Sequence, residues 1–197
     1  MREFRSEEYP DFPPDQTRPS GIKRIARDIL EISLISLFLF ISINTLSARI
    51  RIESVSMEPT LYAGNFVVVN KLAYRFADPS RGDIIVFRYP LNPEQVPYIK
   101  RVIGLPGDHL QVREGEVQIN GVRIAEPYLD SSTRQGGKWI VPPDSLFVMG
   151  DNRNNSSDSR SWGFVPIDNV IGKALVVYWP PNKWELLDRS YAVAAEP

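Results

Sequence analysis

Residues 83–103 read DIIVFRYPLNPEQVPYIKRVI, and this stretch decides the fold class of the chain. A short run rich in Ile, Val, Phe and Tyr stands at each end of it, which is the composition of β-strands. Three prolines lie between the two runs, and proline is excluded from helix interiors and central strands. The stretch therefore predicts two short strands joined by a loop.

The same composition continues from residue 48 onward, where short β-rich runs alternate with turn residues. The dipeptide Asn120-Gly121, between EVQI and VRI, is a strong signal of a two-residue hairpin turn. No run in this region is long enough for an amphipathic helix. We expect a mainly β, antiparallel domain over residues 48–190. The predicted strands are 65–70, 83–88, 98–103, 116–120, 145–149 and 173–179.

Length and composition exclude several classes of protein. The chain has 197 residues, enough for one domain of usual size and an appendage. Its net charge of -1 argues against a general nucleic-acid binder, so no nucleic-acid partner is expected. The absence of Cys excludes disulfides, a Cys nucleophile and an iron–sulfur cluster. A single histidine, His109, excludes a two-His zinc site.

Residues 29–46 read ILEISLISLFLFISINTL and have the composition of a membrane anchor. Twelve of these eighteen residues are strongly apolar, and a helix of this length spans about 27 Å, enough for the hydrocarbon core of a bilayer. A buried core helix and a cleaved signal peptide are the alternatives. Residues 46–49, LSAR, form a poor small-x-small cleavage site, so we interpret the segment as an uncleaved anchor.

The distribution of basic residues predicts the orientation of this anchor, because the cytoplasmic flanks of membrane spans are enriched in Lys and Arg. Near the span, four basic residues precede it and two follow it: Arg18, Lys23, Arg24 and Arg27, then Arg49 and Arg51. We therefore expect a disordered cytoplasmic tail at 1–20, a basic lead-in and anchor at 21–47, and the β domain on the trans side of the membrane. Residues 191–197 are expected to be a flexible tail.

Elimination leaves few options for nucleophilic catalysis. His109 follows Pro106-Gly107-Asp108 in a predicted turn, where histidine is more often solvated than part of a Ser-His-Asp triad. No aspartic-protease motif or phosphate-binding glycine loop is present, so Ser, Thr and Lys remain as candidates. Ser54 and Ser56 are two apart, and in an extended stretch both hydroxyls face the same side. A serine pair before a proline is also typical of an ordinary turn.

Lys100 is a candidate base. Strand alternation sends Lys100 and Arg101 to opposite faces, so one of the two cations must face apolar neighbours. A lysine in such a place has a lowered pKa, because burial disfavours the charged amine, and the neutral amine can accept a proton from a serine hydroxyl. The alternative is an edge-strand lysine whose amine reaches water.

A third segment, residues 149–164, reads MGDNRNNSSDSRSWGF and completes a pattern of four motifs. The others are SMEPTL at 56–61, RGDIIVF at 81–87 and YIKRVIGLPGD at 98–108. In this order and spacing, behind an N-terminal anchor, the motifs resemble those of the type I signal peptidases, also called leader peptidases. The resemblance covers about residues 21–180 and implies a catalytic domain of coiled antiparallel β-sheets.

The resemblance implies a role for each matching residue. Ser56 is expected to be the nucleophile and Lys100 the general base that deprotonates it. Ser54 is expected to donate a hydrogen bond to the oxyanion together with the backbone N–H of Ser56. Ser156 is expected to orient the Lys100 amine. The remaining matches are expected to be structural: a charge cluster of Asp158, Arg160 and Arg101, and the scaffold residues Asp151, Asn152 and Arg153.

The implied function is that of a single-pass membrane serine endopeptidase with a Ser/Lys dyad. It is expected to remove N-terminal signal peptides from exported preproteins, cutting after small-x-small sites such as Ala-x-Ala, without a metal or organic cofactor. The expected partners are preprotein signal peptides and the lipid bilayer. A single span is similar to Gram-positive, cyanobacterial and organellar members, so the expected location is a plasma membrane or a thylakoid membrane.

Two alternatives stand beside this interpretation. One is a self-cleaving Ser/Lys protease related to the SOS-response repressors, which would be soluble and is disfavoured by the anchor. The other is a catalytically silent, single-pass β adaptor that binds exported proteins. An adaptor has no reason to combine Ser56, Lys100 and Ser156, so this combination favours the enzyme.

Two further features have open interpretations. The aromatic side chains of Phe66, Trp162 and Trp179 either place the catalytic face against lipid or fill the core. The sequence Ala192-Val193-Ala194 matches the small-x-small pattern. It is either a segment that the enzyme clips slowly or binds weakly, or an ordinary Ala-rich terminus.

Overall fold

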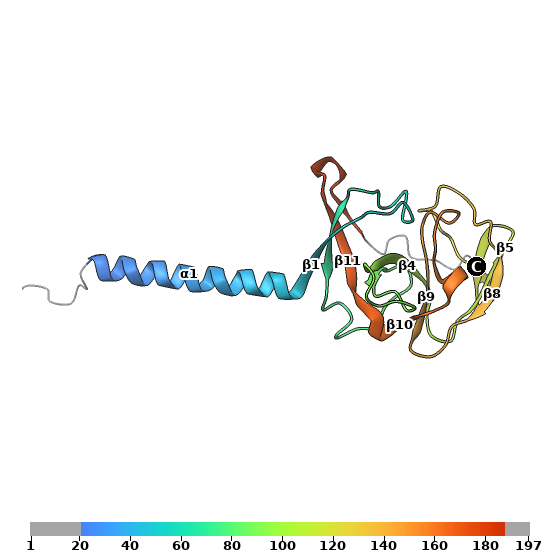
Figure 1. The fold of residues 1–197 in the computed structure, drawn as a ribbon, viewed down its shortest axis with the longest axis horizontal. Coiled ribbons are helices and arrows are strands. Elements are labelled where there is room, and N and C mark those ends of the chain that lie inside the picture. The colour runs from blue at the N-terminus through green and yellow to red at the C-terminus, as the bar shows by residue number, and fades with distance from the viewer. Residues whose placement is uncertain (1–20, 188–197) are drawn as a thin grey trace, which may run out of the picture. The chain divides into compact units, whose positions relative to one another are not determined.

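The structure, a computed structural model, describes residues 21–187 of the chain. Figure 1 shows one long helix in blue, followed by a strand-rich region in green to red. The disordered tail expected at 1–20 and the flexible tail expected at 191–197 lie outside the described residues, and so does the sequence Ala192-Val193-Ala194.

Helix α1 (Gly21–Leu46) carries the predicted membrane segment. Its 26 residues span about 39 Å at a rise of 1.5 Å per residue. None of its side chains is buried, although most side chains from residue 29 onward are apolar. Among the described residues, it is the one helix whose length and composition would allow it to cross a membrane. The basic lead-in at 21–28 is helical as well, since it holds no proline or internal glycine.

Most strands belong to one antiparallel sheet of eight strands, in the order β1-β2-β11-β3-β4-β9-β10, with β12 paired to β11. The predicted antiparallel, mainly β fold is confirmed. The strands of this sheet are β1 (Ser47–Arg51), β2 (Phe66–Asn70), β3 (Ile84–Phe87), β4 (Tyr98–Gly104), β9 (Ser145–Met149), β10 (Val165–Pro166), β11 (Val170–Trp179) and β12 (Glu185–Leu186).

The two strands predicted in the stretch 83–103 are present as β3 and β4, and the structure places them side by side in this sheet. Ile85 pairs with Lys100 across the two strands. All four residues of β3 are buried, and so is β4 from Ile99 onward. Because both faces of this strand pair are covered, both cations of β4 are buried, Arg101 as well as Lys100, where the sequence pattern required only one.

A second antiparallel sheet has the order β7-β6-β5-β8. Asn120 and Gly121 join two of its strands with φ values of 53° and 83°, which suit a type I′ turn and confirm the predicted hairpin. His109 is exposed, but it is the first residue of a strand, so its predicted place in a turn is wrong. The turn closes one residue earlier, where the Asp108 carboxylate accepts the backbone N–H of Leu105. The strands are β5 (His109–Arg113), β6 (Glu116–Ile119), β7 (Val122–Arg123) and β8 (Gly137–Ile140).

Helices are short in the strand-rich region that the structure describes. The α-helix there is α2 (Ser159–Trp162), and two 3-10 turns are η1 (Ile167–Asn169) and η2 (Pro181–Lys183). Trp162 packs against Phe87 and Tyr89, with ring centroids 6.1 and 5.5 Å away, so it fills the core. Trp179 is 52% exposed at the end of β11, and Phe66 is half-buried. The three aromatic residues therefore occupy different environments.

Candidate active site

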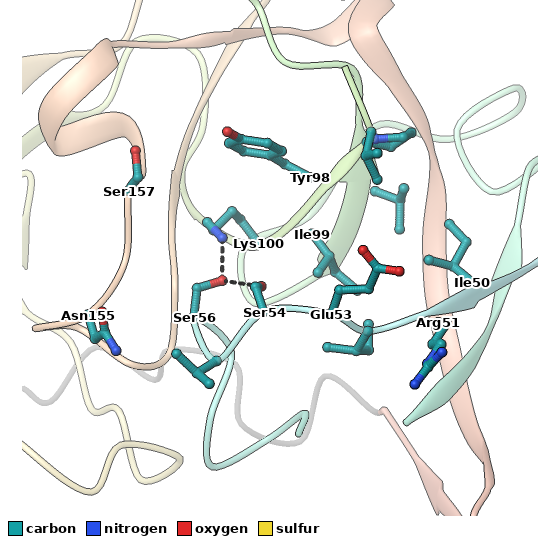
Figure 2. Close-up of a pocket in the computed structure, with 15 residues that line it drawn as sticks. Ile50, Arg51, Glu53, Ser54, Ser56, Tyr98, Ile99, Lys100, Asn155 and Ser157 are labelled. Atoms are coloured by element: carbon teal, nitrogen blue, oxygen red, sulfur yellow. Dashed lines mark hydrogen bonds between the residues drawn. The ribbon is translucent and has the colours of Figure 1, made fainter. Parts of the chain in front are cut away.

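A groove of about 560 Å³ lies between two extended segments of the chain, and Figure 2 shows the side chains that line it. Residues 50–56 form one flank and residues 96–100 the other, and Asn155 and Ser157 also contribute. The lining is mainly apolar. Its apolar members are Ile50, Ile52, Val55, Val86, Val96, Pro97, Tyr98 and Ile99.

Both flanks have backbone edges that no other strand of the described residues covers. Strand β1 is the outermost strand of its sheet and pairs only with β2. Strand β4 pairs with β9 from Arg101 onward, so residues 98–100 are paired only with β3. Unpaired strand edges bind extended peptides through main-chain hydrogen bonds. The groove can therefore hold an extended segment of polypeptide between the two edges.

Ser56 lies in a loop that follows β1 and is closed by contacts within itself. The backbone N–H of Ile52 donates to the carbonyl of Asn65 at 2.8 Å, which joins the two ends of the loop. Met57 and Leu61 are fully buried and anchor the loop in the core. These contacts hold the Ser56 side chain at the groove, where it is 7% exposed.

Lys100 and Ser56 are in direct contact in the groove (Figure 2). The Nζ of Lys100 donates to the Oγ of Ser56 at 2.5 Å. The Oγ of Ser54 lies 3.2 Å from the same oxygen, so the two serine hydroxyls face one side, as their spacing predicts. The structure thus brings together three of the residues predicted from sequence, from segments 44 residues apart.

Burial lowers the pKa of Lys100 from 10.5 to about 8, in the direction expected from sequence. The carboxylates of Asp158 and Asp151 oppose this effect, since negative charge favours the protonated amine, but burial is the larger cause. The amine is then neutral in a substantial fraction of molecules at mildly alkaline pH. Ser56 therefore lies beside a group that can accept its proton.

Ser156 lies near Ser56, on the loop between β9 and α2. A Cβ added to Gly150 would come within 2.3 Å of the Ser156 Oγ and 2.4 Å of the Ser56 carbonyl oxygen, so only glycine fits between them. The Ser156 Oγ is buried and has no hydrogen-bond partner among the described residues. The expected hydrogen bond to Lys100 is thus not formed here, and the orienting role of Ser156 stays a prediction.

Two bidentate ion pairs lie close enough to Lys100 for their carboxylates to affect its pKa. Arg101 donates from Nε and Nη2 to Asp151 at 2.9 and 2.6 Å. Arg160 donates from Nε and Nη2 to Asp158 at 2.8 and 2.7 Å, and Asp158 also accepts the backbone N–H of Gly150. All four side chains are at most 1% exposed. The three residues expected in one charge cluster, Asp158, Arg160 and Arg101, thus lie in two separate ion pairs, and Asp151 is the partner of Arg101.

Sequence reasoning missed a third ion pair in this cluster. The guanidinium of Arg153 donates to the carboxylate of Glu126, 27 residues away, and to the Oγ1 of Thr133. The ring of Tyr128 lies 3.9 Å below the guanidinium of Arg101. No local pattern around Glu126 marks it for this role, because the pairing exists only in the tertiary structure.

Comparison with known proteins identifies the family of this chain. The family model described as signal peptidase, peptidase S26, matches residues 25–179, which is most of the chain. The chain belongs to the signal peptidase I family. Like its relatives, it is a membrane-associated serine endopeptidase that removes N-terminal signal peptides from preproteins.

Similar members of the family come from several bacteria. Signal peptidase I of Leptolyngbya laminosa is 45% identical over 186 residues, covering 88% of this chain and 91% of that protein. Probable signal peptidase I-2 of a Synechocystis strain is 42% identical over 162 residues, covering 77% of this chain and 72% of that protein. A solved structure, a signal peptidase I from Enterococcus faecalis, is 36% identical and covers 49% of this chain and 97% of that chain, with a TM-score of 0.45.

Membership in the family decides between the interpretations that the sequence left open. The predicted family, fold class and enzyme class are confirmed. The silent adaptor and the self-cleaving repressor-like protease are accordingly set aside.

Proposed function

We propose that Ser56 and Lys100 form the catalytic dyad of this signal peptidase, with Ser56 as the nucleophile and Lys100 as the general base. The observation that carries the proposal is the contact of 2.5 Å between the Lys100 Nζ and the Ser56 Oγ. The lowered pKa of Lys100, about 8, supports it because a base must be neutral to accept a proton. The unpaired strand edges on both sides of Ser56 support it as well, since they offer a place for the substrate.

In the proposed reaction, the neutral amine of Lys100 takes the proton of the Ser56 hydroxyl while the Oγ attacks the scissile carbonyl carbon. Negative charge then develops on the carbonyl oxygen, and the Ser54 hydroxyl and the Ser56 backbone N–H donate hydrogen bonds to it. The Lys100 ammonium returns the proton to the leaving amine as the C–N bond breaks. The neutral amine of Lys100 then takes a proton from water, which attacks the acyl ester, and the proton passes to the Ser56 Oγ as the ester C–O bond breaks. This chemistry requires neither a metal nor an organic cofactor.

Ser156 is the proposed orienting group for Lys100. A buried hydroxyl without a partner costs about 1–3 kcal/mol, and a hydrogen bond to the Lys100 ammonium would recover this energy. The unpaired, buried Oγ of Ser156 next to Gly150 supports this role. The ion pairs of Arg101 and Arg160 are proposed to hold the surrounding backbone in place.

Cleavage after small-x-small sites is the proposed specificity. An extended peptide between the two strand edges would turn its side chains at positions -1 and -3, counted back from the cut, toward the apolar lining. Bulky side chains already occupy that lining, among them Ile52 and Ile99. Small residues at these two positions would therefore fit best.

The proposed membrane arrangement is a single pass, with the N-terminus in the cytoplasm and the catalytic region on the trans side of a plasma or thylakoid membrane. The basic residues Lys23, Arg24 and Arg27 in the first turns of α1 support this orientation. The exposed indole of Trp179 supports a contact between the catalytic region and the lipid interface. No nucleic-acid partner is proposed.

Incubation of the detergent-solubilised full chain with a model preprotein tests the proposal. N-terminal sequencing of the product is expected to show one new terminus, directly after an Ala-x-Ala sequence. Ser56→Ala and Lys100→Ala are each expected to give no product while remaining folded. Cleavage at an unrelated sequence would contradict the proposed specificity, and cleavage by Ser56→Ala would contradict the proposed nucleophile.

A further inference from the structure

Glu53 is a charged side chain at the rim of the otherwise apolar groove. It is exposed, it lines the groove next to Ser54, and its carboxylate has no hydrogen bond or ion pair within residues 21–187. Figure 2 shows this carboxylate directed toward the middle of the groove, whereas the guanidinium of Arg51 points the other way. The carboxylate is therefore available to a bound substrate.

The local alternation of the chain decides which part of a substrate meets Glu53. Ile50 and Ile52 turn inward and are half-buried and buried. Arg51 and Glu53, between and after them, are exposed. An extended peptide along this segment alternates in the same way, so its side chains at -1 and -3 face the lining and its side chain at -2 faces outward. Glu53 directly precedes Ser54, whose Oγ lies 3.2 Å from the Ser56 Oγ, so Glu53 lies close to the point of cleavage. The first outward side chain before the cut is the one at -2, and we therefore place it nearest to Glu53.

Two cationic side chains, Arg51 and Lys100, line the same groove, but neither forms an ion pair with the Glu53 carboxylate in the part of the chain that the structure describes. Lys100 is buried against Ser56 and loses its charge in the state that accepts a proton. On the outward side of the groove, Glu53 is therefore the charged residue next to Ser54, and Arg51 lies two residues further from Ser56 along the chain.

We propose that Glu53 is a specificity-determining residue that favours a basic over an acidic side chain at position -2 of the substrate. The inference rests on the proposed cleavage by Ser56 and Lys100 in this groove. Exposed ion pairs are weak, so the expected preference is roughly two- to tenfold in kcat/KM for Lys over Glu at -2. The unfavourable approach of an acidic side chain contributes as much to the selection as the favourable approach of a basic one.

Three quenched fluorescent peptides that differ only at position -2 test the proposal, with Ala at -1 and -3 and Lys, Gln or Glu between them. For the full chain in detergent, kcat/KM is expected to fall in the order Lys, Gln, Glu. Glu53→Gln is expected to bring the ratio of Lys to Glu close to one, and Glu53→Lys to invert it. Glu114→Gln, which removes an exposed carboxylate in the turn between β5 and β6, is expected to keep the wild-type ratio. Salt at about 1 M should reduce the wild-type ratio, because exposed charges are screened.

Equal values of kcat/KM for the three wild-type reactions would overturn the proposal, as would an unchanged ratio in Glu53→Lys. A charge preference that appears only when the same residues are placed at -4 would overturn the assignment to position -2.

Failure of wild type to cut any of the peptides would contradict the proposed function and not by itself the role of Glu53. Binding then decides the role of Glu53, with the same peptides titrated into Ser56→Ala and into Ser56→Ala combined with Glu53→Lys. Tighter binding of the Lys peptide that reverses in the double variant supports the proposal. Equal affinities in both proteins overturn it.

Discussion

Lys100 and Arg101 are neighbours on β4 and are almost equally buried, with 4% and 1% of their surface exposed. Their side chains nevertheless contact different partners. Burial acts to lower the pKa of Arg101, but the hydrogen bonds and charge of Asp151 outweigh it and raise the pKa above the ordinary value. Lys100 contacts a neutral hydroxyl instead, and burial lowers its pKa to about 8. One strand thus carries a permanent cation and a cation that can lose its proton.

The difference shows that the partner, and not burial alone, decides what a buried cation does. A bidentate carboxylate fixes the charge of Arg101 and makes it part of the framework. A serine hydroxyl leaves the Lys100 amine free to exchange its proton, which is what a general base requires. The two cations and the groups around them can be changed one at a time.

Lys100→Arg should have the largest effect, because it makes the two neighbouring cations alike. A guanidinium stays protonated at any usable pH, so the variant has no base at this position. Cleavage is expected to fall by roughly the full catalytic contribution of the dyad, about 10⁴-fold or more. The initial rate of preprotein cleavage measures this, and the melting temperature shows whether the variant is folded. Near-normal activity in a folded Lys100→Arg protein would refute the dyad.

Asp151→Asn tests the surroundings of Arg101, since it removes the negative charge that pairs with Arg101 and keeps the shape of the Asp151 side chain. Leaving one charge of a buried pair uncompensated costs about 3–5 kcal/mol of unfolding free energy. Chemical unfolding of the full chain, followed by tryptophan fluorescence, measures the loss. Asp130→Asn, a matched change at an exposed position, is expected to alter the free energy by less than about 0.5 kcal/mol. Equal stability of the two variants would show that Arg101 does not depend on Asp151.

Ser54→Ala leaves Lys100 and Arg101 unchanged and removes the hydroxyl beside the proposed nucleophile, Ser56. Loss of an oxyanion donor typically lowers kcat by about 10²- to 10³-fold, with little change in KM. Ser54→Thr keeps a hydroxyl and should retain much of the activity. Steady-state kinetics with a model peptide separates kcat from KM. If Ser54→Ala mainly raised KM, Ser54 would be a substrate-binding residue.

Asp158→Asn tests the charge around Lys100, and its expected effect on the folded protein is a change in the pH dependence of cleavage, the smallest effect among these predictions. The Asp158 carboxylate raises the pKa of Lys100, so its removal should lower that pKa further. The rising limb of kcat/KM against pH is then expected to move to lower pH than in wild type, with Asp130→Asn showing no shift. A movement to higher pH would contradict the sign of this interaction.

Local sequence patterns were sufficient for much of the fold. The two runs in 83–103 are rich in β-formers and are separated by prolines, so their structure as two short strands follows from composition, whereas their pairing with each other does not. The hairpin at Asn120-Gly121 follows from turn chemistry in the same way. The turn before His109 was misplaced by one residue, because strand boundaries depend on pairing with another strand, here β8.

The candidate site could be predicted only in part. Elimination alone left Ser, Thr and Lys as possible catalytic groups, and the resemblance of four motifs then selected Ser56 and Lys100. The contact between these two side chains joins segments 44 residues apart. A local repeating pattern in the sequence cannot predict that segments so far apart come into contact. The pairing of Arg153 with Glu126 was missed for the same reason.

The pH dependence of kcat/KM for the wild-type full chain tests the central claim, that Lys100 is the base for Ser56, most directly. With a model peptide as substrate, the rate should rise about tenfold per pH unit in the acid range and level off near an apparent pKa of about 8. A rate that is constant from about pH 6 to 9, or a limb that continues upward to the ordinary lysine pKa of 10.5, would contradict the claim.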